Sequence, residues 1–208
     1  KLYQAQKPAL QKLLGSQGMM LLYSVPWGPQ GVYSKKPLAS GADMKGLKWR
    51  AYSPATARIA ELVGATPVTV QAAELSQALA TGVVDSYMSS LSTGYDTKTY
   101  ESIKHWYDVQ AWLPRNAVLV SAKAFNALDK ATQEAVLAAA DAAEKRGWKL
   151  SEEKNAWYAE QVTKNGMQVL PPPAALTADM KKVGDVMLAD WLKKAGPDGQ
   201  AIIDAYRK

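Results

Sequence analysis

Cysteine is absent from the 208-residue sequence, and histidine and phenylalanine occur once each. The lack of cysteine excludes a disulfide scaffold, a thiol nucleophile and any cysteine-type zinc site. A Gly-rich phosphate loop, a nucleophile elbow and two histidines at metal-binding spacing are also missing. We therefore expect no catalytic residues, no metal site and no cofactor.

The sequence also has no cluster of one charge and no long apolar run. Its formal charge is +6, but the lysines and arginines are scattered, which favours a solvated basic surface over a nucleic-acid footprint. The apolar stretch at 19–23 is too short to span a bilayer, so we expect no transmembrane anchor. The start at Lys1, with neither an initiator methionine nor a signal-type segment, indicates a processed product or a piece of a longer chain.

What the sequence does contain is enough apolar residues for a core, with 48% hydrophobic and 21% charged residues. Apolar spacing predicts a helix over 2–14, then a buried strand at 19–23, and residues 26–46, with three prolines, indicate a long connection. The next segments predict a small parallel sheet with helices on its faces. They are a strand at 48–52, a helix at 53–64, a strand at 67–70, a helix at 72–80 and a strand at 83–88.

The C-terminal half is dominated by one long helical pattern. It follows two strands, at 104–112 and 117–121, and runs from a cap at Asp129 to residue 165. Such a helix is roughly 55 Å long at about 1.5 Å per residue, so it should cross more than one lobe. The last predicted elements are a strand at 167–170, a helix capped by Thr177 that ends at Gly196, and a short helix at 200–206.

Arg50 is the first candidate for a ligand-binding residue. It ends a predicted strand, so its side chain should point from the carboxyl edge of the sheet, where ligands of α/β folds usually bind. A guanidinium group is a planar fork that suits a carboxylate. On the residues alone, a surface ion pair is an equally good interpretation.

The segments DMKGLKWR (43–50), ELVGATPV (61–68) and AELSQALATGVVDSYMSS (73–90) carry a family resemblance, which continues through residues 101–136. They resemble the DctP-like family, the periplasmic solute-binding proteins of tripartite ATP-independent periplasmic (TRAP) transporters. The resemblance implies an α/β, periplasmic-binding-protein-like fold, with two lobes joined by hinge strands and a long lobe-spanning helix, and with the first lobe incomplete in this chain. The expected division places 1–27 and 116–155 in partial lobe 1 and the crossing elements, and 28–115 and 156–208 in lobe 2.

The resemblance also implies a binding site. Arg50 matches the arginine that pairs with the ligand carboxylate, and Ser89, beside Met88, falls where relatives often have asparagine. Gln30 stands where relatives that bind more highly charged acids often have a second arginine, and a neutral amide there favours a monocarboxylate by charge matching. Aromatic side chains at or near strand ends are expected to line the cleft: Trp27, Tyr52, Tyr87 and Trp112.

The sequence therefore predicts a periplasmic solute-binding protein, not an enzyme. We expect it to capture a small organic monocarboxylate, with 2-oxo and aromatic acids as candidates, by hinge closure and to deliver it to the permease subunits of a TRAP transporter. A homodimer or a domain-swapped partner is a further expectation, since an incomplete lobe would expose apolar surface. The alternatives are an α/β enzyme that acts on a small organic acid, and an interaction module that binds no ligand.

Overall fold

The computed structural model describes residues 1–208 and divides into two compact units. Unit 1 comprises Lys1–Pro26, Arg115–Ser151 and Leu188–Lys208, and unit 2 comprises Trp27–Pro114 and Glu152–Met187. This division differs from the expected one at the C-terminal residues 188–208. By their contacts these residues group with unit 1, and the other boundaries differ from the expected ones by one to four residues.

Unit 2 is built on a six-stranded mixed sheet with the strand order β4-β3-β5-β2-β6-β8. Strand β3 pairs in parallel with β4 and with β5, which confirms the predicted parallel strands. On the other side, β2 runs antiparallel to both β5 and β6. The strands are β2 (Gln30–Ser34), β3 (Lys48–Ala51), β4 (Thr66–Thr69), β5 (Ser86–Ser89), β6 (His105–Trp112) and β8 (Gln168–Leu170).

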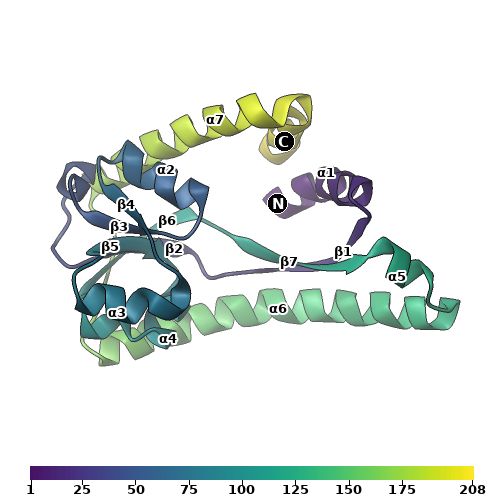
Figure 1. The fold of residues 1–208 in the computed structure, drawn as a ribbon, viewed down its shortest axis with the longest axis horizontal. Coiled ribbons are helices and arrows are strands. Elements are labelled where there is room, and N and C mark those ends of the chain that lie inside the picture. Colours follow the sequence, from purple (N-terminus) through teal and green to yellow (C-terminus); the bar gives the residue numbers. More distant parts are fainter. The chain divides into compact units, whose positions relative to one another are not determined.

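Helices cover both faces of this sheet (Figure 1). The hydrophobic cluster on one face includes Ile59 and Leu176, and the cluster on the other face includes Leu75, Leu91 and Val162. The short helices are α2 (Pro54–Leu62), α3 (Leu75–Ala80) and α4 (Leu91–Asp96), with 3-10 turns η1 (Gly41–Met44), η2 (Ala72–Glu74) and η3 (Thr99–Glu101). Apolar residues occur in nearly every element of unit 2 because both faces of the sheet carry a hydrophobic cluster.

The start of α2 shows how closely local sequence determines this unit. Ser53 accepts a hydrogen bond from the Thr56 backbone N–H, the Thr56 hydroxyl reciprocates at the Ser53 backbone N–H, and Pro54 occupies the first turn. This is a capping box with proline in the first helical turn. It ends β3 abruptly and leaves Arg50 close to the strand end.

Residues 26–46 are not the long connection that we expected, because they contain β2, which is buried along its whole length. Gly31 hides this strand from sequence patterns, since glycine has low strand propensity. A Cβ atom at Gly31 would collide with the Tyr107 carbonyl oxygen and the Trp106 ring, and the β2–β6 register shifts between Gln30 and Val32. A close approach and a bulge therefore require glycine at this position.

Unit 1 contains a two-stranded antiparallel sheet of β1 (Met19–Pro26) and β7 (Arg115–Ser121). Two helices belong to it, α1 (Leu2–Ser16) and α5 (Ala122–Asn126). The predicted helix and strand at the start of the chain are confirmed, as is the strand at 117–121, which begins two residues earlier than expected.

Two long helices contribute residues to both units. In α6 (Lys130–Lys164), residues up to Ser151 belong to unit 1 and residues from Glu152 belong to unit 2. Asp129 caps the start of this helix, as predicted, by accepting a hydrogen bond from the Thr132 N–H at 2.9 Å. The predicted cap Thr177 is wrong, because α7 (Ala174–Arg207) begins three residues earlier and the Thr177 hydroxyl donates to the Pro173 carbonyl. Gly196 has a non-helical backbone and interrupts α7 where the predicted helix ends. None of the helices combines the length and the apolar character that a bilayer crossing requires.

Candidate functional site

The register of the unit 2 sheet brings three predicted ligand residues to one edge. Ser89 is the last residue of β5 and pairs with Gly31, so it lies next to Gln30, the first residue of β2. On the other side of β5, Arg50 pairs with Tyr87, two residues before Ser89. This edge is the carboxyl edge of the parallel strands, the position that was expected for Arg50.

Arg50 is 4% exposed and yet has no acidic partner. Its Nε donates to the Val70 carbonyl oxygen at 2.9 Å, and none of the ion pairs of the chain includes it. Its two terminal nitrogens are not sealed inside the protein and remain accessible to solvent. Burial lowers the pKa of Arg50, although a guanidinium still keeps its charge at neutral pH.

Tyr52 and Gln30 complete the surroundings of this guanidinium. The Cζ of Arg50 lies 5.0 Å from the centroid of the Tyr52 ring, and the Tyr52 hydroxyl donates to Gln30 Oε1 at 2.7 Å. Gln30 is 5% exposed, whereas Tyr52 is 37% exposed. The three side chains form a continuous group that combines one positive charge, one aromatic face and one neutral amide.

Ser89 adds a hydroxyl group next to this group. Its backbone carbonyl accepts a hydrogen bond from the Trp106 Nε1 at 3.3 Å, and its hydroxyl is not one of the fully buried atoms without a partner. Trp112 ends β6 directly opposite Gln30, and Trp27, 43% exposed, precedes β2 and donates its backbone N–H to the Pro114 carbonyl. The structure therefore places both tryptophans at the same end of the sheet as Gln30.

Tyr87 and Met88 do not belong to this group, although the sequence suggested both. Each is completely buried, in clusters on opposite faces of the sheet. Tyr87 stacks on Tyr33 at 4.4 Å between ring centroids, and its hydroxyl shares a hydrogen bond with Thr99. Because side chains alternate between the faces of a strand, two consecutive residues of β5 enter the two cores, and we remove both from the candidate site.

The Val70 carbonyl was missed by sequence reasoning. It accepts the Arg50 Nε and thereby fixes the direction of the guanidinium. No side chain carries this role, so the only possible signal was the position of residue 70 just after β4, the strand beside Arg50.

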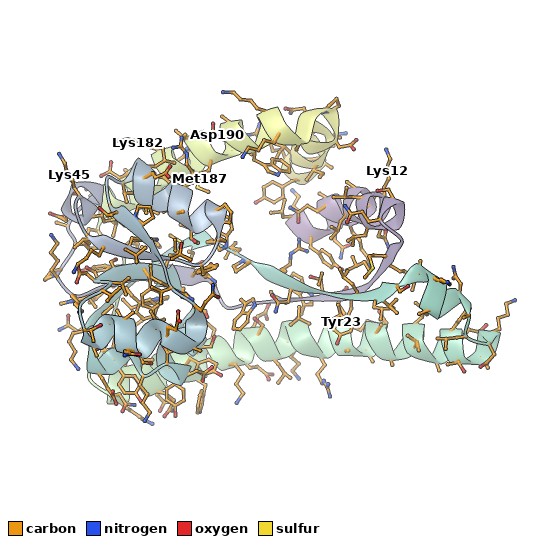
Figure 2. All side chains as sticks on the ribbon, viewed as in Figure 1. Lys12, Tyr23, Lys45, Lys182, Met187 and Asp190 are labelled. Carbon is orange, nitrogen blue, oxygen red and sulfur yellow. The ribbon has the colours of Figure 1, made fainter.

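Unit 2 also has a hollow of about 380 Å³ elsewhere, lined by η1, α2 and α7. Lys45 and Lys182, labelled in Figure 2, belong to its lining, and none of the predicted ligand residues does. Lys182 is paired with Asp179 at 3.0 Å. The hollow therefore offers no free charge from Lys182 and is separate from the Arg50 group.

No set of three or more His, Asp or Glu side chains lies close enough to hold a metal ion. Glu74 accepts the Gln71 backbone N–H in a capping box, and Asp85 lies 3.9 Å from Lys35. These contacts give the two acidic residues structural roles.

Comparison with known proteins decides the family. The DctP sequence family, described as bacterial extracellular solute-binding protein, family 7, matches residues 2–194. The chain belongs to this family. The resemblance inferred from the sequence motifs is thereby confirmed for almost the whole chain.

Solved DctP-family structures share the fold. DctP6 of Bordetella pertussis, an extracytoplasmic solute receptor binding pyroglutamic acid, is 68% identical, and the match covers 99% of this chain and 68% of that chain with a TM-score of 0.97. A marine metagenome TRAP solute-binding protein specific for pyroglutamate is 44% identical, covering 99% and 68% of the two chains with a TM-score of 0.94. The predicted α/β fold of TRAP periplasmic binding proteins is thus confirmed.

A curated DctP-family relative is more distant. It is the solute-binding protein NAS141_03721 of Sulfitobacter sp. (strain NAS-14.1), 24% identical over 160 residues, which are 76% of this chain. The match spans 48% of that protein. This chain therefore corresponds to about half of the curated relative.

Proposed function

We propose that this chain is the ligand-binding part of an extracytoplasmic receptor for a small organic monocarboxylate, which it delivers to the membrane permease of a TRAP transporter. The observation that carries the proposal is the nearly buried guanidinium of Arg50, which has no acidic partner in the chain. A ligand carboxylate would supply the missing charge through two parallel hydrogen bonds. The receptor then works by binding alone, in the periplasm, and catalyses no reaction.

Pyroglutamate is the first candidate ligand. DctP6 and the metagenome protein, both similar over nearly the whole of this chain, bind it. Pyroglutamate carries one carboxylate, and the Arg50 group offers one positive charge, because Gln30 is neutral. Ser89, Tyr52, Trp27 and Trp112 would add a hydroxyl group and aromatic surface around the small ring.

Binding of carboxylates to the purified protein tests the proposal. Pyroglutamate, pyruvate, benzoate and succinate are compared by thermal shift and by calorimetry. A ligand at a hundred times its Kd stabilises the folded state by about 2.7 kcal/mol, which is a measurable shift in melting temperature. We expect pyroglutamate to give the largest shift and succinate, with two charges, a smaller one than the monocarboxylates.

Two results would contradict the proposal. If no carboxylate raises the melting temperature of the folded protein, an interaction module that binds no ligand is the better description. If a carboxylate is consumed and a product appears in mass spectra, the protein is an enzyme. The two-lobe division, hinge closure and a homodimer or swapped partner stay predictions, and size exclusion with intact mass tests the oligomeric state.

A further inference from the structure

Tyr52 touches both polar partners of the candidate site at once. Its ring lies against the Arg50 guanidinium, and its hydroxyl donates to Gln30 Oε1 at 2.7 Å. Burial raises the pKa of the Tyr52 hydroxyl, so this group keeps its proton and can act as the donor. The tyrosine therefore links the charge to the amide through one side chain.

The hydrogen bond determines which end of the Gln30 amide is free. A glutamine amide has a carbonyl oxygen that accepts and an NH2 group that donates. The Tyr52 hydroxyl holds the oxygen, while the Nε2 makes no hydrogen bond within the chain. Gln30 is 5% exposed, and its Nε2 is not sealed from solvent.

We propose that Tyr52 is a positioning residue that turns the Gln30 amide so that its NH2 group faces the ligand, and that the site thereby selects carboxylates with a second, uncharged carbonyl acceptor. The inference rests on the proposed function and deepens it. A lactam or ketone oxygen would accept the Gln30 N–H while the carboxylate binds Arg50. A methylene group at the same place leaves the amide donor without a hydrogen-bond partner. The affinity for such an analogue is therefore lower.

A matched pair of ligands isolates this choice. 3-Oxocyclopentanecarboxylate and cyclopentanecarboxylate have the same ring and charge and differ only in the ring carbonyl. Calorimetry with the full chain should give the ketone an affinity at least about tenfold higher, the ratio expected of one well-formed hydrogen bond in a buried site. Pyroglutamate, which has its carbonyl at the same ring position, should bind like the ketone.

Substitutions then separate the donor from the residue that orients it. Gln30→Leu should bring the affinity ratio of the pair close to one, because no donor remains. Tyr52→Phe keeps the ring against Arg50 and removes only the hydroxyl, so the ratio should fall by about threefold or more while cyclopentanecarboxylate keeps its affinity within about twofold. Tyr206→Phe is the control, since Tyr206 is 42% exposed in the last turns of α7 and belongs to unit 1.

The outcomes distinguish this inference from the proposed function. If wild type binds no carboxylate, the proposed function fails and the inference with it. If wild type binds both ligands of the pair and Tyr52→Phe leaves their ratio unchanged, only the inference is overturned. A uniform loss of affinity for both ligands in Tyr52→Phe would likewise overturn it. Such a loss leaves the affinity ratio of the two ligands unchanged, as expected of a tyrosine with a merely structural role.

Discussion

The two units each hold an arginine that makes no ion pair, and the two differ in burial and in neighbours. Arg50 is 4% exposed, whereas Arg115 is partly buried and its Nη1 has no hydrogen-bond partner. Arg115 in unit 1 donates through Nη2 to Gln6 Oε1, and its Cζ lies 4.2 Å from the Tyr3 ring centroid. Burial lowers the pKa of Arg115, and the electrostatic effects of Tyr3 and Glu144 partly restore it. Arg50 in unit 2 has one backbone carbonyl and one aromatic ring, but no acidic residue.

The difference separates a structural arginine from one kept for a ligand. In unit 1, the carboxylate of Glu144 accepts the Tyr3 hydroxyl and the Ser24 N–H, both at 2.9 Å, so one cluster joins α1, β1 and α6 to Arg115. A buried charge without a partner destabilises a fold, and a sequence keeps one where binding requires it.

The largest effect is expected from Arg50→Ala. Stranding one member of a buried ion pair costs about 3–5 kcal/mol, so calorimetry should show that pyroglutamate binding falls by more than a hundredfold. The melting temperature of the ligand-free variant should stay equal or rise, because an uncompensated charge has been removed. An unchanged pyroglutamate affinity would show that Arg50 is not the anchor.

Arg50→Lys is expected to have the next largest effect. Lysine keeps the charge, but an ammonium group cannot form two parallel hydrogen bonds or stack flat on Tyr52. We expect a loss of affinity of about 10- to 100-fold, measured by the same calorimetry. Full affinity in this variant would mean that the site needs only the charge, and not the planar fork.

Sequence reasoning located Arg50, Gln30 and Ser89 without showing how they meet. Capping residues and alternating patterns act over a few positions, and they correctly predicted α2 and the parallel β3. Which strands pair, and in which register, depends on packing between distant segments. The strand that carries Gln30 was therefore missed, because the need for glycine at position 31 comes from Trp106 and Tyr107.

The same limit explains the two wrong candidates in β5. A pattern at a strand end does not reveal whether a side chain faces a ligand or a core, and Tyr87 and Met88 both face cores. The Val70 carbonyl, which directs Arg50, is a backbone group that every residue type supplies. Such contacts can be found only in a folded structure.

Arg115→Ala should reverse the pattern of Arg50→Ala. Loss of the guanidinium removes its contact with the Tyr3 ring, its hydrogen bond to Gln6 and its electrostatic attraction to Glu144. We expect the free energy of unfolding to fall by about 2 kcal/mol, as measured by urea denaturation. Pyroglutamate affinity should stay within about threefold of wild type. If binding is lost while stability is kept, the contrast between the two arginines is wrong.

The smallest effect concerns the pH dependence of unit 1. Burial, together with the hydrogen bond to Glu144, raises the pKa of Tyr3 from the usual tyrosine value to about 12. The folded state therefore keeps a proton that the unfolded chain releases near pH 10, so stability is complete below pH 10 and falls as the pH rises toward 12. Tyr3→Phe keeps the ring against Arg115 and should cost about 1 kcal/mol at pH 7 through the lost hydrogen bond. This variant has no proton to lose at position 3, so its urea midpoint should fall less steeply than that of wild type between pH 9 and pH 11. Parallel curves for the two proteins would show that the Tyr3–Glu144 contact does not stabilise the cluster around Arg115.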